Sequence, residues 1–369
     1  MKIAVLSSHT SSLFWFRMDM MKDFIKEGHT VIALGSEPEA KWKREFEQYS
    51  IDYRQLNVER NGMNPLRDLS TLRALNKFMK KEKPDKIFTY QAKTIVYGSI
   101  AAKVNGISEV YPLIAGLGSI FRGKGFKNII VKSIMKLEYW IACKCSKKVF
   151  FQNHDDKNEF IQNGLIKDEK TVIINGSGVN LEKFKQTLLP EETVFLFIGR
   201  LIKDKGIIEY LEACKQIKNK FPHVRCLLVG PYDSNPSALK PEELQPYIDT
   251  NIIEYFGEQS DVRPFIAQCS TYLLPSYHEG TPKTVLEAMA MGRAIITSDA
   301  PGCRETVIDG ENGYLVKVKD VQGLVDKMDY LINHQDISRL MGNESAKIAI
   351  EKYDVKIVNE AIMQTMELF

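Results

Sequence analysis

The sequence has few of the residues that bind metal ions. It contains six histidines and six cysteines in 369 residues, and it has no D-x-D triplet. No group of histidine, cysteine and carboxylate residues has the spacing of a metal site, and only Cys143 and Cys145 are close together, as C-x-C. The sequence therefore predicts reduced thiols and an activity that uses neither a metal nor another cofactor.

The sequence also lacks segments that cross a membrane or bind nucleic acid. No apolar run reaches the length of a membrane span, and the run in residues 1–8 is too short for a secretory signal. No helix-turn-helix, zinc finger or RNP-like segment occurs. We expect a cytoplasmic protein without a nucleic-acid partner.

The length, the composition and the pattern of apolar segments indicate two globular domains. The length exceeds that of a usual single domain, and 44% hydrophobic with 26% charged residues is an ordinary globular composition. Apolar runs suited to buried strands alternate with helical segments from residue 3 to 152, and again from residue 194. This predicts an α/β fold with two parallel, Rossmann-like sheets, each covered by helices on both faces. We place the domains at residues 1–186 and 187–354, followed by a helix at 355–369.

The two halves differ in charge. Residues 1–185 contain 31 Lys and Arg against 20 Asp and Glu, whereas residues 186–369 contain 19 against 27. The net charges are therefore +11 and −8, which points to an anionic partner for the first half, either a membrane surface or nucleic acid. Because no nucleic-acid-binding motif is present, we favour the membrane.

The strongest motif lies in residues 274–290. It begins at the end of an apolar run suited to a buried strand, Gly280 permits a tight turn, and Thr281 followed by Pro282 suits the N-cap and first position of a helix. The first turn of such a helix offers unpaired backbone N–H groups to a phosphate. The motif therefore predicts an anion site at the carboxyl edge of a sheet.

Two carboxylates flank this predicted helix start. Glu279 precedes it, and Glu287 lies within the helix between Leu286 and Ala288, where an unpaired carboxylate is costly. We expect a polar partner to meet Glu287. The alternative is a capped helix with one solvated glutamate and one paired in the core.

A second motif follows the first strand of the second series. Arg200 stands at the strand end and Lys205 comes five positions later, before Gly206 and a new helix. Arginine supplies a planar fork and lysine a compact charge, so the pair can converge on one anion. A basic, solvated loop is the alternative.

Together, these motifs resemble the R-x4-K-G and E-x7-E elements of the retaining, metal-independent glycosyltransferases of family four, also called glycosyltransferase group 1. That family has the GT-B architecture. The resemblance implies two Rossmann-like domains with a central cleft and a last helix, here 355–369, that crosses back to the first domain.

The resemblance also implies roles for individual residues. Glu279 would lie by the transferred sugar, and Arg200 and Lys205 would neutralise the departing diphosphate, so these three form the catalytic set. The acceptor hydroxyl would attack the face from which the diphosphate leaves, with retention and no dedicated base. Glu287 would bind the ribose, and the other donor-binding residues would be Gly199, Gly280, Thr281, Pro282, Lys283 and Thr284.

In the first domain, the resemblance is to a particular subgroup. Residues 113–119 have no histidine where many relatives have one. This version resembles enzymes that act on polyprenyl-diphosphate-linked sugars in bacterial capsule, O-antigen and protein-glycosylation pathways. It implies transfer of an N-acetylated amino sugar from a UDP-sugar to such an acceptor.

Two residues are candidates for contact with that acceptor. His9 lies in a serine-rich loop after the first strand, where many relatives have glycines, and a surface role is an equal alternative. Lys93 stands at a strand end and could bind the acceptor diphosphate.

Residues 119–148 suit an anionic membrane surface. They contain eight basic residues against a single acid, Glu138, interleaved with apolar and aromatic residues. We expect peripheral association with the inner face of the cell membrane. The alternative is a helix that faces the core and has a solvated basic side. The basic residues are Arg122, Lys124, Lys127, Lys132, Lys136, Lys144, Lys147 and Lys148.

Two other functions fit the same architecture. One is a nucleotide-sugar epimerase, which needs catalytic acids in the cleft but no membrane-facing surface. The other is a binding module for nucleotide sugars without catalysis.

Overall fold

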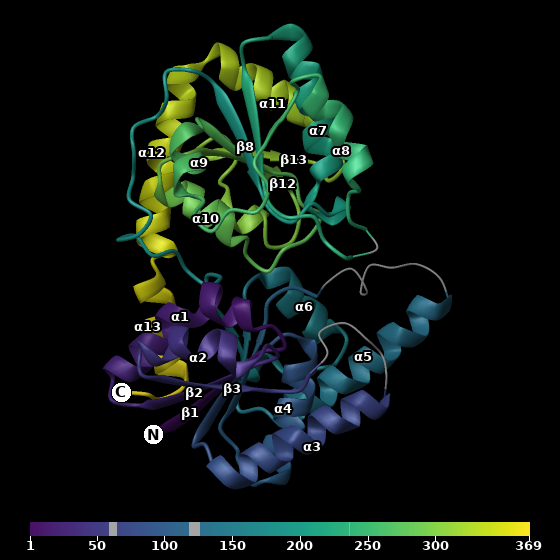
Figure 1. Ribbon diagram of the computed structural model, residues 1–369, viewed down its shortest axis with the longest axis vertical. Coiled ribbons are helices and arrows are strands. Elements are labelled where there is room, and N and C mark those ends of the chain that lie inside the picture. The colour runs from purple at the N-terminus through teal and green to yellow at the C-terminus, as the bar shows by residue number, and fades with distance from the viewer. Residues whose placement is uncertain (59–64, 118–125, 236) are drawn as a thin grey trace. The chain divides into compact units, whose positions relative to one another are not determined.

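The computed structural model describes residues 1–58, 65–117, 126–235 and 237–369, and it forms two compact units (Figure 1). The first unit comprises Met1–Ser177 and Val355–Phe369, and the second comprises Gly178–Asp354. The division thus falls after residue 177 and not after residue 186, the boundary predicted from the sequence. Residues 178–186 belong to the second unit because Val179 and Phe184 are buried in its core.

The first unit is built on a seven-stranded parallel sheet with the order β3-β2-β1-β4-β5-β6-β7. Successive residues of a strand face opposite sides of a sheet. Accordingly, Ile3 and Val5 of β1 pack into one core cluster, and Ala4 and Leu6 pack into another. The strands are β1 (Lys2–Leu6), β2 (Thr30–Gly35), β3 (Ile51–Gln55), β4 (Lys86–Tyr90), β5 (Val110–Ile114), β6 (Val149–Phe151) and β7 (Thr171–Ile173).

Helices cover both faces of this sheet (Figure 1). The cluster with Ile3 includes residues of α1 and α13, and the cluster with Ala4 includes residues of α3 and α4. The helices are α1 (Thr10–Lys26), α2 (Glu39–Glu47), α3 (Pro65–Glu82), α4 (Ala92–Val104), α5 (Phe126–Lys144), α6 (His154–Gln162) and α13 (Val355–Thr365).

Helix α13 is part of the first unit although it follows the second in the chain. Val358, Ile362 and Met366 are buried in the cluster formed with α1. The Asn359 side-chain amide donates to Asp23 of α1 at 2.6 Å. The prediction that residues 355–369 return to the first domain is therefore confirmed.

The second unit has a six-stranded parallel sheet with the order β10-β9-β8-β11-β12-β13 and one continuous core. Its strands are β8 (Val194–Ile198), β9 (Arg225–Val229), β10 (Glu254–Tyr255), β11 (Thr271–Leu274), β12 (Ala294–Ser298) and β13 (Gly313–Val316). Its helices are α7 (Ile207–Lys220), α8 (Pro241–Asp249), α9 (Arg263–Gln268), α10 (Lys283–Ala290), α11 (Val321–Asn333) and α12 (Gln335–Lys352).

The predicted α/β class with two parallel sheets is confirmed, and the cleft between the domains stays a prediction. The elements that were not predicted include β3, whose sequence IDYRQ is mostly polar, and the three-residue β7. Both are edge strands, which carry weaker hydrophobic patterns than central ones. Within the described ranges, no helix has both the length and the apolar character needed to cross a membrane.

Candidate active site

The segment between β11 and α10 carries the first motif. The chain bends at Gly280 and Thr281, and α10 begins at Lys283. The predicted N-cap was one residue early, because Pro282 rather than Thr281 holds that position. The Pro282 carbonyl accepts the first helical hydrogen bond, from the Val285 N–H at 3.0 Å. The amino end of α10 therefore follows the motif's turn, as expected.

Lys205 and Glu279 meet in the second unit. The Lys205 Nζ lies 2.5 Å from the Glu279 Oε1, and the two side chains are only 23% and 12% exposed. Two hydrogen bonds to the Asp204 carbonyl hold the two loops together, from the Tyr277 N–H at 2.9 Å and from the Ser276 hydroxyl at 3.1 Å. The structure thus joins the two motifs, which are 74 residues apart.

Two glycines allow this close approach of loops. Gly206 has φ of 73°, and a Cβ there would lie 2.1 Å from the Pro275 carbonyl oxygen. Gly302 has φ of 77°, and a Cβ there would lie 2.2 Å from the Glu279 carbonyl oxygen. Any side chain at either position would push the loop that bears Glu279 away.

A hydrogen bond between Tyr277 and Glu209, which was not predicted from the sequence, also holds this loop. The Tyr277 hydroxyl donates to Glu209 Oε1 of α7 at 2.6 Å. Burial and the neighbouring Glu209 carboxylate raise the pKa of Tyr277, so the hydroxyl stays protonated and can donate. The pair ties the loop of Glu279 to the helix after Lys205. Its partners lie 68 residues apart, so no local pattern signals it.

Arg200 is held by a different carboxylate. It follows β8, and its Nη1 lies 2.8 Å from Asp233 Oδ2 in the segment after β9. The Arg200 side chain is 40% exposed, and Asp233 contacts only its Nη1 in this ion pair. Gly199, beside it, donates its N–H to the Val229 carbonyl at 3.0 Å. Both predicted phosphate-binding cations are therefore present, each paired with an acid of the same unit.

Glu287 is a buried carboxylate without a hydrogen bond to the described part of the chain. It is 8% exposed. Burial raises the pKa of Glu287 to about 7, and the charges of Lys283 and Lys183 offset only part of that rise. The described residues thus do not supply the predicted polar partner, which leaves the carboxylate suited to hydroxyl groups of a ligand.

Thr284 links the first turn of α10 to the end of β8. The Tyr272 hydroxyl lies 2.7 Å from Thr284 Oγ1 and 3.0 Å from the Ile198 carbonyl oxygen. The strand that precedes Arg200 and the helix that follows Glu279 are therefore fixed to one another through the core.

The two residues predicted to contact the acceptor, His9 and Lys93, both lie in the first unit. His9 is the N-cap of α1, and its ring lies 3.2 Å from the Ser11 hydroxyl. Lys93 lies in the first turn of α4 and forms an ion pair with Asp68 of α3 at 2.6 Å. Both pair members are less than one-fifth exposed, so the charge of Lys93 is largely neutralised in this structure.

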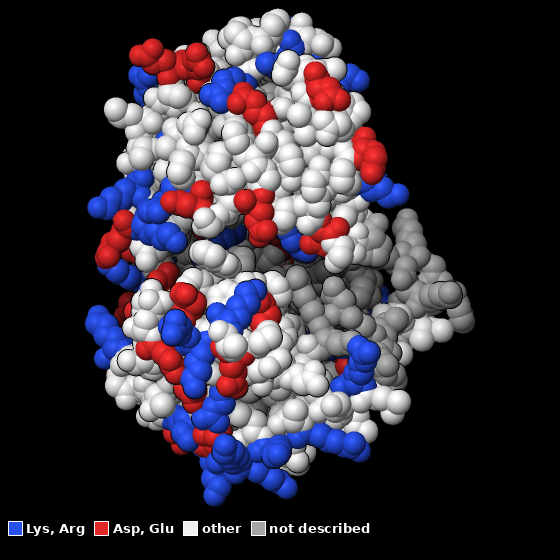
Figure 2. All heavy atoms as spheres, in the orientation of Figure 1, with Lys and Arg blue, Asp and Glu red and all other residues white. Residues whose placement is uncertain are grey.

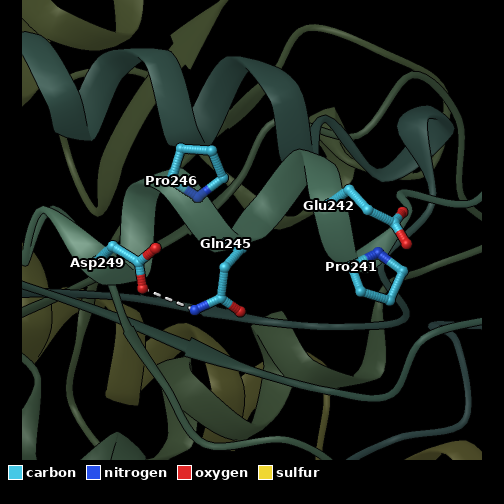
Figure 3. A pocket seen from close by; sticks show the side chains of 5 residues that line it. All are labelled: Pro241, Glu242, Gln245, Pro246 and Asp249. Carbon is cyan, nitrogen blue, oxygen red and sulfur yellow. Dashed lines mark hydrogen bonds between the residues drawn. The ribbon is translucent and has the colours of Figure 1, made fainter.

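The described residues form no metal site, and the pocket along α8 is not a second diphosphate site. In the described residues, no group of three or more His, Cys, Asp or Glu side chains could hold a metal ion. A shallow pocket runs along α8 (Figure 3), lined by Pro241, Glu242, Gln245, Pro246 and Asp249. Its lining has two acids and no cation, so it is unsuited to a diphosphate.

Comparison with protein families identifies the chain. Residues 179–348 match the family described as glycosyl transferases group 1, and residues 2–153 match the family described as glycosyl transferase 4-like. The chain belongs to the group 1 glycosyltransferases. The predicted family is confirmed, and the matched ranges include every residue of both motifs.

Two bacterial relatives resemble this glycosyltransferase over most of its length. It is 28% identical to the N,N'-diacetylbacillosaminyl-diphospho-undecaprenol alpha-1,3-N-acetylgalactosaminyltransferase of Campylobacter jejuni, over 99% of this chain and 98% of the relative. It is 27% identical to the UDP-Gal:alpha-D-GlcNAc-diphosphoundecaprenol alpha-1,3-galactosyltransferase of Escherichia coli, over 71% and 70%.

A solved structure confirms the GT-B fold. The glycosyltransferase superposes with a TM-score of 0.78 on the crystal structure of Anabaena Alr3699/HepE in complex with UDP and glucose. The match covers all of both chains at 20% identity. At that identity the likeness concerns the fold alone.

Proposed function

We propose that this protein is a retaining, metal-independent glycosyltransferase. It would move an N-acetylated amino sugar from a UDP-sugar to a polyprenyl-diphosphate-linked saccharide, in capsule or other surface-glycan assembly. The observation that carries the proposal is the contact of 2.5 Å between Lys205 and Glu279 beside the start of α10. It brings a cation, an acid and the amino end of a helix together in the donor-binding unit.

The donor diphosphate would lie against three positive groups. Lys205, Arg200 and the first turn of α10 would share the charge that develops as the diphosphate leaves. Lys205 would exchange its pair with Glu279 for a phosphate oxygen, and Arg200 would use the N–H groups that do not face Asp233. Because these groups supply the stabilisation, the reaction would need no metal.

The two glutamates would bind the parts on either side of the diphosphate. Glu279, once released from Lys205, would accept hydrogen bonds from hydroxyls of the transferred sugar. Glu287 would accept them from the ribose, whose two hydroxyls can satisfy a buried carboxylate. Backbone groups of Gly199, Gly280 and Thr281 and the turn Pro282–Lys283–Thr284 would complete the donor site.

The relatives support the acceptor. The names of both state a diphospho-undecaprenol-linked sugar acceptor and an alpha-1,3 linkage, and one names N-acetylgalactosamine as the transferred sugar. A UDP-hexose with an α-linked diphosphate that yields an α-glycoside is transferred with retention. We therefore expect an α-linked product here.

The outward face of α5 supports peripheral membrane association. Its large exposed side chains are Ile129, Ile130, Ile134, Leu137 and Trp140, and Lys132 and Lys136 are half-buried beside them. The exposed side is thus largely apolar, with Lys144 exposed in the last turn, which disfavours a merely solvated helix. Arg122 and Lys124, from the predicted basic set, lie outside the described residues, as do the side chains of Phe126 and Lys127.

Helix α3 of the same unit carries a cluster of basic side chains. Figure 2 shows basic side chains gathered along the part of the first unit formed by α3. Arg67, Arg73, Lys77, Lys80 and Lys81 are the exposed basic residues of that helix. Anionic lipid headgroups attract such clusters, so we place the enzyme at the inner, cytoplasmic face of the membrane.

One experiment separates the three candidate functions. The purified protein is mixed with labelled UDP-sugars, UDP-N-acetylgalactosamine included, with and without a bacterial membrane-lipid extract. Label in the lipid fraction supports sugar transfer to a lipid. An α linkage in that product supports retention, and transfer in the presence of a chelator supports metal independence. Interconversion of the free UDP-sugar would instead indicate an epimerase, and tight binding without turnover would indicate a binding module.

A further inference from the structure

Arg17 is a buried cation in the first unit that the donor chemistry of the second unit does not use. It belongs to α1 and is only 3% exposed. The guanidinium carbon lies 5.2 Å from the centroid of the Tyr90 ring and 5.8 Å from that of Phe88. Both rings belong to β4, and Tyr90 is the last residue of that strand.

No counter-ion for Arg17 comes from the described residues. Its Nε is enclosed without a hydrogen-bond partner. Burial lowers the pKa of Arg17 to about 10, which still leaves the side chain charged at neutral pH. A buried charge without a counter-ion is costly, and the faces of two aromatic rings offset only part of that cost. An anionic ligand would supply the missing partner.

The position of Arg17 directs this charge to the ligand-binding edge of the sheet. Long side chains of a helix lean toward its amino end. Helix α1 begins at Thr10, close after the carboxyl end of β1. The side chain therefore leans toward the carboxyl edge of the sheet, where open parallel sheets bind ligands.

The loop at that edge is fixed by polar contacts. The Ser7 and Ser8 hydroxyls donate to Gln91 Oε1 at 2.9 and 2.7 Å, and the Ser12 hydroxyl lies 3.0 Å from the Tyr90 hydroxyl. Gln91 has φ of 71°, a conformation that few residues other than glycine adopt. These contacts build a polar wall beside the ring that Arg17 touches.

We propose that Arg17 binds a phosphate group of the lipid-linked acceptor at the carboxyl edge of the first sheet. The proposal rests on the proposed transferase function and adds a residue to it. Lys93 was the cation predicted for this role, but its charge is paired with Asp68. A guanidinium fork binds two phosphate oxygens at once, which suits a diphosphate.

The test uses the full chain with its donor site filled by saturating UDP. Inorganic pyrophosphate and farnesyl diphosphate, a short polyprenyl diphosphate, are then titrated by calorimetry into wild type, Arg17→Met and Arg17→Lys. We expect both probes to bind wild type and to bind each variant at least about tenfold more weakly. UDP affinity, measured separately, should be unchanged.

Stability provides a second readout. Replacing a buried charge that has no counter-ion by methionine is often neutral or stabilising, so Arg17→Met should keep or raise the melting temperature. Arg54→Met is the matched control, because Arg54 pairs with Asp52 at 2.7 Å and with Glu82. This control should lose stability and keep normal binding of both probes.

Three outcomes would overturn the assignment. They are unchanged binding of the probes in both Arg17 variants, UDP affinity that falls as much as probe affinity, and binding of pyrophosphate without competition from farnesyl diphosphate. A matching fall in UDP affinity would indicate that Arg17 acts on the donor. Pyrophosphate binding without competition from farnesyl diphosphate would indicate a site for free phosphate. Binding of the probes does not require sugar transfer. If the probes bind in an Arg17-dependent way but the protein transfers no sugar, the proposed function is refuted and the Arg17 site is not.

Discussion

At the scale of single residues, the contact between Lys205 and Glu279 is the feature that the proposed chemistry needs most. Both residues were predicted because their motifs resemble the R-x4-K-G and E-x7-E elements of the family, and such elements are visible in a sequence. Their meeting at 2.5 Å was not visible, since it depends on loop contacts made by Asp204 and Gly302.

Glu279→Ala and Lys205→Ala should each lower the transfer rate by about a hundredfold or more, as expected for loss of a group that stabilises transition-state charge. Lys203→Ala is the matched control, because Lys203 lies in the same turn but forms an exposed pair with Glu243 at 3.3 Å. Initial rates with labelled donor and melting curves would be measured for all three. Full activity in the Glu279 and Lys205 variants would remove both from the site.

Glu287 should make donor binding depend on pH. With a pKa of about 7, the carboxylate ionises between pH 6 and 8, and only the ionised form accepts hydrogen bonds from both ribose hydroxyls. UDP affinity should therefore rise about tenfold over that range. Glu287→Gln should lose this dependence, and it also reports any contribution from the UDP phosphate itself. The same profile in both proteins would contradict the ribose assignment.

The stability of the folded protein should fall with rising pH, whereas UDP affinity rises. The pKa of Glu287 is raised from 4.5 to about 7 in the folded state, so between these values the folded chain holds a proton that the unfolded chain has lost. The free energy of unfolding therefore falls as pH rises through this window. Glu287→Gln should match wild type near pH 4 and melt at a higher temperature at pH 8.

At the scale of elements, most central strands were predictable because buried parallel strands are continuous apolar runs. The central strand β12 and the helices α11 and α12 were not assigned from the sequence. The edge strands β3 and β7 were not predicted, because edge strands carry weaker hydrophobic patterns than central ones. Helix α5 was predicted as basic and aromatic, but its outward face could not be read from composition. Which residues face out depends on how α5 packs against α4.

We expect α5 to carry the membrane contact. Replacing Ile134 and Leu137 by glutamate places two charges in its exposed apolar face and should abolish most co-flotation with vesicles that contain anionic lipid. Leu340→Glu is the matched control, because Leu340 is equally exposed on α12 of the second unit. Equal flotation of both variants would show that α5 does not bind the membrane.

At the scale of the whole molecule, the two units were predictable as a pair of sheets, whereas their boundary was not. The sequence signal between β7 and β8 is a loop, and only packing shows that Val179 and Phe184 belong to the second core. The return of residues 355–369 came from the family resemblance, since a single amphipathic helix does not indicate which sheet it covers.

Removing residues 355–369 should destabilise the first unit selectively. The deletion exposes the apolar cluster of α1 and removes the hydrogen bond between Asn359 and Asp23. Calorimetry should show a lowered transition for the first unit and an unshifted one for the second, and saturating UDP should still stabilise the second. A single thermal transition at the wild-type temperature would contradict the role of residues 355–369 in stabilising the first unit.

The place of α13 in the chain also bears on biosynthesis. Residues 178–354 leave the ribosome before residues 355–369, so the second unit has its complete set of strands and helices while the first still lacks one of its covering helices. The first unit therefore stays incomplete, with part of the α1 surface exposed, until residues 355–369 have been synthesised. Newly made protein should be most prone to capture by chaperones in that interval, although half of it is already able to fold.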